Sequence, residues 1–351
     1  MSKEKSRVSI KDIADALDIS TTTVSFVMNG KAKNKISEEV IQKVEKYISE
    51  VGYKPNSSAQ SLRTGKSKTI LYMAEDISDP FFSAIAKEME ELAFNSGYKI
   101  IYCSTENKKE KALELLSFFR EKQVDAFIIT PPDDFESEIE EFISKNKNVV
   151  LFDRYYQNIK HNYVVLDNYQ STKRSTELFV NKGFKEIGFV GLNSDLSVIK
   201  DRQKGYFEVI NRENLIPYNL MIDYDKVDTV DGIRMFETFI DENPKLDSIL
   251  FATNSLAIIG LKVLKKKNIK IPSEMGILTF EDRDLFEHHS PSISVLRQPI
   301  AELAGELINK TLELMNTKRY KNKVFQVVLS GELIPRDSTQ KSAEIHLSDK
   351  K

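Results

Sequence analysis

Hydrophobic residues recur at helical spacing in three consecutive stretches of the first 52 residues. Ser9 is a good N-cap for a first helix, whose apolar positions are Ile10, Ile13, Ala14 and Leu17. After a polar break at 18–20, Ser20 can cap a second helix that runs from Thr21 to about Asn29 and is closed by Gly30. Ser37 starts a third helix that ends at Gly52, with apolar positions Val40, Val44, Ile48 and Val51. The pattern predicts a helix-turn-helix followed by a third helix that closes a small core.

The second helix presents polar side chains opposite its apolar face. Val24, Val27 and Met28 share one face, so the other side chains point away from the core. Small hydroxyls, an amide and an apolar ring suit the major groove of DNA, where base edges offer donors, acceptors and methyl groups. The plainer interpretation is a capped helix start with Phe26 packed on a neighbouring helix. Within the larger pattern we predict DNA contacts from the caps Ser9 and Ser20 and from Thr21, Thr22, Ser25, Phe26 and Asn29.

Charge divides the chain in the same way. Residues 1–68 carry 13 Lys and Arg against 8 Asp and Glu, a net charge of about +5, whereas the remainder carries 38 against 45, about −7. Lys31, Lys33 and Lys35 crowd the loop after the second helix, where they would add salt-sensitive affinity for phosphates. The basic N-terminal end is therefore the predicted DNA end. The whole-chain net charge of −2 argues against nonspecific polycation binding as the main activity.

Sequence motifs in a fixed order accompany these helices. They are Ile10-Lys11-Asp12-Ile13-Ala14, Thr23-Val24-Ser25, Gly52-Tyr53-Lys54-Pro55-Asn56 and Ser61-Leu62-Arg63-Thr64-Gly65. In order and spacing they resemble the lactose repressor (LacI/GalR) family of transcriptional regulators. The resemblance covers Val8 to about Asp337 and implies a repressor that binds a near-palindromic operator as a homodimer.

The resemblance also implies a hinge helix between the DNA-binding domain and the rest. About eight residues are too few for a stable isolated helix in water, so we expect this segment to order when it binds DNA. Leu62 would insert into the minor groove as an apolar wedge, and Asn56 and Arg63 would contact the backbone or groove. A linker leucine that packs on the next domain is the alternative.

After residue 67 the pattern alternates between strands and helices. Strands are predicted at 69–74, 98–104, 124–130 and 148–153, and a second series at 186–191, 220–224, 248–253 and 276–280, with intervening helices such as 81–95, 108–122, 171–181 and 255–267. Such alternation predicts doubly wound parallel sheets in two similar lobes. The predicted fold class is therefore an N-terminal all-α helix-turn-helix domain with a hinge helix, followed by an α/β core that resembles periplasmic binding proteins.

The predicted boundaries follow from these patterns. They are 1–54 for the DNA-binding domain, 55–67 for the hinge helix and linker, and 68–337 for the effector-binding and dimerisation core. Lobe 1 would comprise about 68–165 and 297–326, and lobe 2 about 166–296 and 327–337. The tail 338–351 has no leucine heptads of the kind that join four chains, so we expect a dimer with a mobile tail.

Polar and aromatic side chains follow the predicted strands, where ligands of doubly wound sheets bind. They are Asp79, Phe81, Phe82, Asp153, Arg154, Asn254 and Glu281. The candidate set also includes Arg202, which precedes Gly205-Tyr206 in the second lobe. The resemblance implies an aromatic stack from Phe81 or Phe82 and hydroxyl partners from Asp153, Arg202 and Asn254, so a sugar or sugar derivative is the expected effector. Two positions depart from the family: Glu281 stands where Asp is usual, and Ser255 where Asp is frequent. The longer glutamate changes the floor of the cleft.

Other functions have less support in the sequence. Asp153, Asp201 and Glu281 could act as acid and base, but no nucleophile elbow or phosphate loop accompanies them, so we predict no enzyme and no cofactor. The adjacent His288 and His289 lack neighbouring Cys or His, so no metal site is predicted. A constitutive architectural DNA-binding protein, or a regulator of the same design with a nucleobase, a phosphoprotein or no effector, stays open.

Composition bounds the setting of the protein. The 351 residues are 40% hydrophobic, enough for two or three domains with full cores, and no apolar run approaches the ~18 residues of a membrane span. The polar start is unlike a signal peptide. The one cysteine, Cys103, falls in an apolar run and predicts a buried thiol. We therefore expect a cytoplasmic protein without membrane partners.

Overall fold

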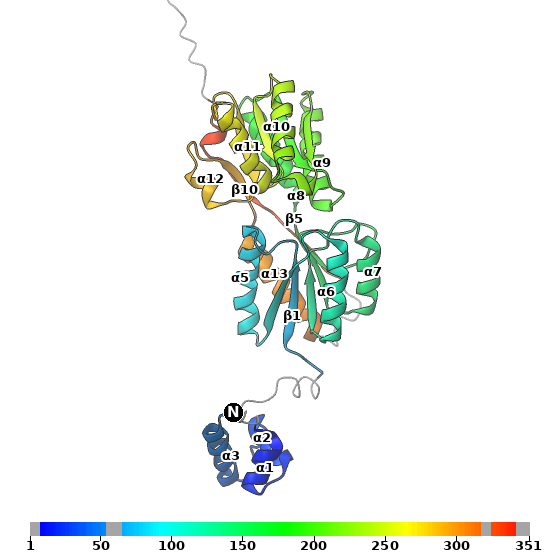
Figure 1. The fold of residues 1–351 in the computed structure, drawn as a ribbon, viewed down its shortest axis with the longest axis vertical. Coiled ribbons are helices and arrows are strands. Elements are labelled where there is room, and N and C mark those ends of the chain that lie inside the picture. Colours follow the sequence, from blue (N-terminus) through cyan, green and yellow to red (C-terminus); the bar gives the residue numbers. More distant parts are fainter. Residues whose placement is uncertain (1–7, 54–64, 317–323, 342–351) are drawn as a thin grey trace, which may run out of the picture. The chain divides into compact units, whose positions relative to one another are not determined.

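The chain folds into two compact units, residues 1–67 and 68–351. The computed structural model describes residues 8–53, 65–316 and 324–341 (Figure 1). In the described residues no helix combines the length and apolar composition needed to cross a bilayer.

The described residues of the N-terminal unit, 8–53 and 65–67, contain three helices that close one small core. They are α1 (Ile10–Leu17), α2 (Thr21–Met28) and α3 (Glu38–Val51). Ser9 and Asp12 form a capping box at the start of α1, and Gly52 ends α3 in the left-handed conformation. The core is built from Ile13, Ala14, Leu17, Val24, Val27, Ala32 and Val44. The predicted helix-turn-helix with a third helix is confirmed, although the Ser37 side chain makes no capping hydrogen bond.

Two six-stranded sheets form the second unit. The sheet of lobe 1 has the order β11-β5-β4-β3-β1-β2, all parallel, from β1 (Thr69–Ala74), β2 (Lys99–Ser104), β3 (Ala126–Ile129), β4 (Val149–Phe152), β5 (Tyr163–Leu166) and β11 (Gln326–Leu329). The sheet of lobe 2 has the order β12-β10-β9-β8-β6-β7, from β6 (Ile187–Leu192), β7 (Tyr218–Ile222), β8 (Ser248–Phe251), β9 (Gly276–Phe280), β10 (Ser294–Arg297) and β12 (Glu332–Ile334). Only β12 runs antiparallel to its neighbour among these strands.

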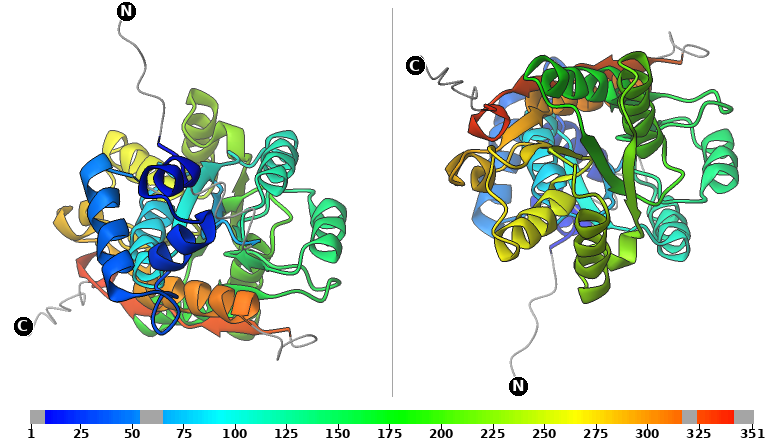
Figure 2. Two further views of the ribbon diagram at one scale, coloured as in Figure 1. Left: turned by 90° about the horizontal axis from the view of Figure 1, so that it is seen from below. Right: turned by 90° about the horizontal axis from the view of Figure 1, so that it is seen from above.

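Helices cover both faces of each sheet (Figures 1 and 2). Lobe 1 carries α5 (Pro80–Asn95) and α13 (Ile300–Asn316) on one face and α6 (Lys109–Glu121) and α7 (Glu136–Lys145) on the other. Lobe 2 carries α10 (Val230–Glu242) and α11 (Asn254–Lys266) opposite α8 (Asn168–Asn181) and α9 (Ser197–Arg212). The short α12 (Asp284–His288) and the 3-10 turns η1 (Tyr224–Lys226) and η2 (Asp337–Thr339) complete the fold. The predicted two-lobed α/β core is confirmed.

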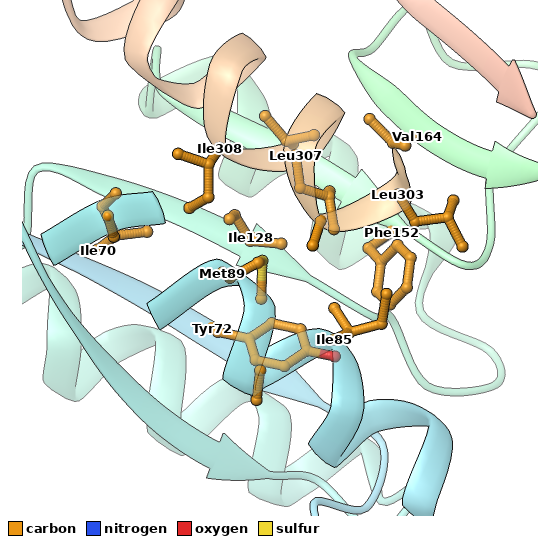
Figure 3. Packing of buried hydrophobic residues seen from close by; sticks show 14 of the residues in the cluster. Ile70, Tyr72, Ile85, Met89, Ile128, Phe152, Val164, Leu303, Leu307 and Ile308 are labelled. Carbon is orange, nitrogen blue, oxygen red and sulfur yellow. The ribbon is translucent and has the colours of Figure 1, made fainter. Parts of the chain in front are cut away.

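The chain passes between the lobes three times, after β5, after β10 and after β11. The second pass returns the chain to lobe 1 as α13 and β11, and the third leads on to β12 in lobe 2. In lobe 1, α13 covers the sheet with Leu303, Leu307 and Ile308 (Figure 3). These side chains pack with Tyr72 and Phe152 in one buried cluster. Lobe 1 therefore needs residues from beyond lobe 2 to complete its core, and the three passes hold both lobes in one unit.

Two predicted boundaries differ from the structure. β11 pairs with β5 in lobe 1, so the chain re-enters lobe 2 after Leu329 rather than at 327. Ser338 and Thr339, assigned to the mobile tail, are buried in lobe 2. Ser338 donates to Ile277 O at 2.6 Å, and the Thr339 hydroxyl lies 2.8 Å from that of Ser294. Their hydrogen bonds extend the ordered core beyond residue 337.

Gly205 sets the distance between α8 and α9. A Cβ at this position would lie 2.4 Å from Tyr169 O, because the two helices pack backbone to backbone. We expect Gly205→Ala to lower the free energy of unfolding of the second unit by about 1–3 kcal/mol. Gly305→Ala is the matched control, since nothing lies within 4 Å of its Cβ position. Equal stability of the two variants in urea unfolding would contradict this packing.

Candidate functional site

Two of the predicted DNA-contact residues, Ser9 and Ser20, use their hydroxyls to cap helices. The Ser9 hydroxyl accepts from Asp12 N and donates to the Asp12 carboxylate at 2.7 Å. The Ser20 hydroxyl accepts from Thr23 N at 3.0 Å. Both residues are exposed. Their capping hydrogen bonds fix the residues at which α1 and α2 begin.

The remaining candidates of α2 lie on its outer face. Thr21, Thr22 and Asn29 are exposed, whereas Ser25 and Phe26 are half-buried. The Asn29 amide donates to Ser25 O, and the Lys35 ammonium lies 5.2 Å from the centre of the Phe26 ring. The Phe26 ring is therefore less exposed to solvent than a ring that projects freely. It still lies on the face of α2 away from the buried Val24 and Val27. This face is the candidate DNA-contact surface.

The predicted hinge contacts Asn56, Leu62 and Arg63 lie outside the described residues. Their roles stay predictions from the sequence.

A cavity of about 330 Å³ lies between the two lobes of the second unit. Residues 75–154 of lobe 1 and 192–281 of lobe 2 contribute its wall. All eight predicted effector residues line it: Asp79, Phe81, Phe82, Asp153, Arg154, Arg202, Asn254 and Glu281. The volume is at the lower end of the range for small-molecule sites, which suits a ligand of monosaccharide size.

Corresponding positions in the two lobes supply two of these carboxyls. Asp153 directly follows β4 and Glu281 directly follows β9, and both have positive φ, at 67° and 69°. A left-handed residue at the end of a strand turns the chain sharply and is uncommon for residues other than glycine. The turn brings both side chains to the carboxyl edge of their sheets, at the wall of the cavity.

Two buried arginines hold fixed positions in this wall. Arg202, 2% exposed, donates to the Asn168 side chain at 2.8 Å and to Ala252 O, with its guanidinium 3.9 Å from the centre of the Phe280 ring. Arg154 pairs with Glu75 and Asp153 and donates to Pro131 O at 2.8 Å. Both arginines therefore brace the strand ends as well as lining the cavity.

Asn254 links carboxyls from both lobes. Its amide nitrogen donates to Glu281 and lies 3.5 Å from an Asp79 oxygen, while its amide oxygen accepts from Arg283 at 2.7 Å. Asp79 also caps α5 by accepting from Phe81 N at 2.8 Å. Arg283, which the sequence pattern did not single out, sets the orientation of the Asn254 amide.

Burial raises the pKa of two carboxyls in the cavity. The pKa of Glu281 rises to about 8, because the group is buried and because Asp79 and Asp153 are negatively charged, although Arg202 opposes the shift. Burial raises the pKa of Asp153 to about 6, with Arg202 opposing and Asp79 reinforcing the shift. These carboxyls are short of compensating positive charge.

The phenylalanines are less open than expected. Phe81 and Phe82 belong to the core of lobe 1, and the Phe81 ring stacks on Phe152 with 5.7 Å between centroids. Only a small part of each ring borders the cavity. The aromatic side chain with the largest exposed share at the wall is Tyr224, at 39%.

Tyr224 was missed because the sequence pattern placed it inside a strand at 220–224. The strand β7 ends at Ile222, and Tyr224 begins the turn η1. Other wall residues that the sequence pattern did not single out also follow strands, among them Glu75, Asp76, Asp133 and Ser194. Ligands of doubly wound sheets bind beyond the carboxyl ends of the strands, so every polar residue that follows a strand was a candidate, including these four.

Comparisons with known proteins agree with both units. Residues 9–56 match the family described as "Bacterial regulatory proteins, lacI family", and residues 176–339 match the "Periplasmic binding protein-like domain". The HTH-type transcriptional regulator RegA of Clostridium saccharobutylicum is 29% identical over 94% of this chain and 99% of its own length. The ribose operon repressor of Haemophilus influenzae is 25% identical over 94% and 98%. The lac repressor dimer bound to operator and the anti-inducer ONPF matches with a TM-score of 0.83 at 20% identity, covering 95% of this chain and 99% of that one.

Proposed function

Because the chain belongs to the LacI family of bacterial regulatory proteins, we propose that a small carbohydrate-like molecule in the interlobe cavity controls its affinity for operator DNA. The protein is a DNA-binding transcriptional regulator with a ligand-binding core, and not an enzyme. The observation that carries the proposal is that all eight effector-binding residues predicted from the sequence line one cavity. A relative named for a ribose operon supports a sugar as the class of effector.

The proposed mechanism is allosteric. The effector binds one arrangement of the lobes better than another, and the change in lobe arrangement alters how two hinges and two recognition helices meet a near-palindromic operator in the cytoplasm. A coupling of about 1–3 kcal/mol would change operator affinity roughly 5- to 150-fold.

Contacts across the cleft provide candidates for this change. The Tyr155 hydroxyl donates to Asp201 at 2.9 Å, and Tyr155 N donates to the Ser197 hydroxyl at 3.0 Å. The Ser194 hydroxyl donates to the Asp133 carboxylate across the same cleft, at 2.9 Å. Each of these bonds joins a residue of lobe 1 to one of lobe 2, so a movement of the lobes must stretch or replace them.

A ligand screen tests the effector class. Thermal unfolding of the full chain is measured with sugars, sugar phosphates and nucleobases, because a ligand that binds only the folded state raises the melting temperature. The proposal predicts stabilisation by a sugar or sugar derivative. Stabilisation by nucleobases alone, or by no compound, would contradict it and favour the nucleobase, protein or effector-free alternatives.

The hinge gives a second prediction. We expect Leu62→Ala to weaken specific operator binding by a few kcal/mol, which is more than tenfold, since the wedge that stabilises a kinked duplex is lost. Effector binding should be unchanged. Leu285→Ala, a truncation of an exposed leucine in α12, is the control. Unchanged operator affinity of Leu62→Ala in fluorescence anisotropy would remove the wedge role.

Dimerisation through the edge of the lobe 1 sheet is part of the proposal. Exposed apolar side chains gather on β2, the edge strand, and on its flanking helices α5 and α6: Leu92, Phe94, Ile101, Leu113 and Phe118. Exposed apolar groups on neighbouring elements are typical of an interaction surface.

We expect Phe94→Lys to raise the dimer dissociation constant at least tenfold, since Phe94 is 75% exposed in the single chain and the change places a charge in the interface. Ile216→Lys, at an exposed apolar position of lobe 2, is the control. Sedimentation equilibrium measures both. A dimer constant equal to that of the wild type in Phe94→Lys would place the interface elsewhere.

A further inference from the structure

The interlobe cavity is strongly acidic. Two guanidinium groups line it, Arg154 and Arg202, against eight carboxyl groups: Glu75, Asp76, Asp79, Asp133, Asp153, Asp225, Asp228 and Glu281. A wall of this composition attracts positive charge and repels phosphate or carboxylate groups on a ligand.

The two guanidinium groups are already engaged by the protein. Arg154 is paired with Glu75 and Asp153, and Arg202 donates to Asn168 and Ala252 O while it lies over Phe280. Burial lowers the pKa of Arg154 to about 10 and also lowers that of Arg202, yet both stay protonated near neutral pH and keep these partners. An anionic ligand would have to compete with these partners.

Three carboxyls of the wall come from three separate elements. Asp79 caps α5, Asp153 directly follows β4 and Glu281 directly follows β9. Among the residues that the structure describes, no Lys, Arg or His nitrogen lies within 4.0 Å of the carboxylates of Asp79 or Glu281. Asp153 has only the Arg154 nitrogen at 3.3 Å, which Arg154 shares with Glu75. The raised pKa values of Glu281 and Asp153 express the same shortage of positive charge.

A buried hydroxyl in the core of lobe 1 also lacks a partner. Tyr72 is fully buried, and its hydroxyl has no hydrogen-bond partner among the described residues. Figure 3 shows this hydroxyl at the Ile85 and Phe152 end of the core, which is the end where Phe152 leads into Asp153. Burial raises the pKa of Tyr72, and the charges of Asp153 and Asp79 reinforce the shift. An unpaired buried hydroxyl is costly, so an ordered water in the core of lobe 1 would satisfy it.

A metal ion does not fit these carboxyls. Within residues 8–53, 65–316 and 324–341, no group of three or more His, Cys, Asp or Glu side chains is placed to hold a metal. The cavity of about 330 Å³ has room for a molecule that brings a positive charge together with several hydrogen-bonding groups.

We propose that the effector carries a protonated amine, as an amino sugar or amino polyol does, and that its ammonium group binds among Asp79, Asp153 and Glu281. This inference rests on the proposed function, since it names the chemical class of the effector of the same cavity. An ammonium group donates three hydrogen bonds, enough for one to each carboxyl, while the hydroxyls of the ligand are left for Asn254 and the remaining wall. Sugar phosphates and sugar acids are excluded from the cavity by the same charges.

Matched ligand pairs test the charge requirement. Thermal unfolding of the full chain at pH 7.5 and low salt is followed with D-glucosamine, D-galactosamine and D-mannosamine, each beside D-glucose, D-galactose or D-mannose, and with glucose 6-phosphate as the anionic probe. At least one amino sugar is expected to bind at least tenfold more tightly than its hydroxyl counterpart, and glucose 6-phosphate is expected not to bind.

Variants connect this preference to the three carboxyls. Glu281→Gln and Asp153→Asn keep the side-chain shapes and should reduce the preference for the amino sugar at least fivefold. Glu141→Gln, at an exposed position of α7, is the control and should retain it. If a variant fails to fold, the matched ligand pairs measured with the wild type still test the preference for an amino sugar.

The outcomes separate the two proposals. A neutral sugar or sugar phosphate that binds as well as its amino counterpart, or an absence of binding by every amino sugar, overturns the ammonium site. If such a neutral sugar also changes operator affinity, the proposed function stands without the ammonium site. An amino sugar that binds the wild type but leaves operator affinity unchanged upholds the ligand class and overturns the proposed function.

Discussion

Replacing Arg202 by methionine is expected to lower the free energy of unfolding of the second unit by about 2–4 kcal/mol and to abolish the response to effector. Arg202 is 2% exposed and donates to Asn168 and to Ala252 O. Its loss leaves two buried acceptors without a donor, at a cost of about 1–3 kcal/mol each. It also removes the positive charge that opposes the raised pKa of Asp153 and Glu281.

The control for this prediction lies on the same helix. Lys200→Met makes the same kind of substitution at a side chain that is 49% exposed and pairs with Asp195 at the surface. Such surface pairs contribute about 0–1 kcal/mol. Urea unfolding compares both variants with the wild type. If Arg202→Met is as stable as Lys200→Met and still responds to effector, Arg202 neither braces the strand ends nor acts in the cavity.

Stability should fall as the pH rises from 5 to 8.5, and Glu281→Gln should remove much of that fall. The pKa of Glu281 is raised from 4.5 to about 8, so between these values the folded state keeps a proton that the unfolded state releases. Stabilisation from the protonated group is complete below pH 4.5 and is lost as the pH passes through 8. Glutamine resembles the protonated acid at all pH values. The wild type is therefore expected to lose on the order of 2–4 kcal/mol relative to the variant across this window.

Urea unfolding at intervals from pH 5 to 8.5 measures this difference. The groups that act on Glu281 are Asp79 and Asp153, which raise its pKa, and Arg202 and Arg283, which lower it. They are present in both proteins, so their own titration largely cancels in the comparison. Parallel pH profiles of the wild type and Glu281→Gln would show that Glu281 is ionised throughout, and the shortage of positive charge in the cavity would then not exist.

The sequence was sufficient for the elements whose pattern is long or clearly capped. The three N-terminal helices were placed from Ser9, Ser20 and the apolar positions, and β1 and β9 were placed with their observed bounds. Four short strands, β5, β10, β11 and β12, were missed, although β3, β4 and β8, of four residues each, were placed. A short apolar run carries too little periodicity to separate strand from helix.

Contacts between distant segments were beyond the sequence pattern. The pairing of β11 with β5, and of Ser338 with the backbone of β9, joins residues that no local signal connects. The same limit applies to the cavity. Because Asp153, Asn254 and Glu281 follow strands, the sequence placed them at the carboxyl edge of the sheets, where they line the cavity. It could not show that Arg202 is held by Asn168 and Ala252, or that Arg283 orients Asn254.

Control of DNA binding by the interlobe cavity can be measured in one titration. An operator is first selected from random DNA with the full chain, and its dissociation constant is then measured by fluorescence anisotropy with and without a saturating ligand from the thermal screen. We predict that the ligand changes this constant by roughly 5- to 150-fold and that Glu281→Gln needs a higher ligand concentration for the same change. An operator affinity that is the same with and without the bound ligand would show that the cavity does not govern DNA binding.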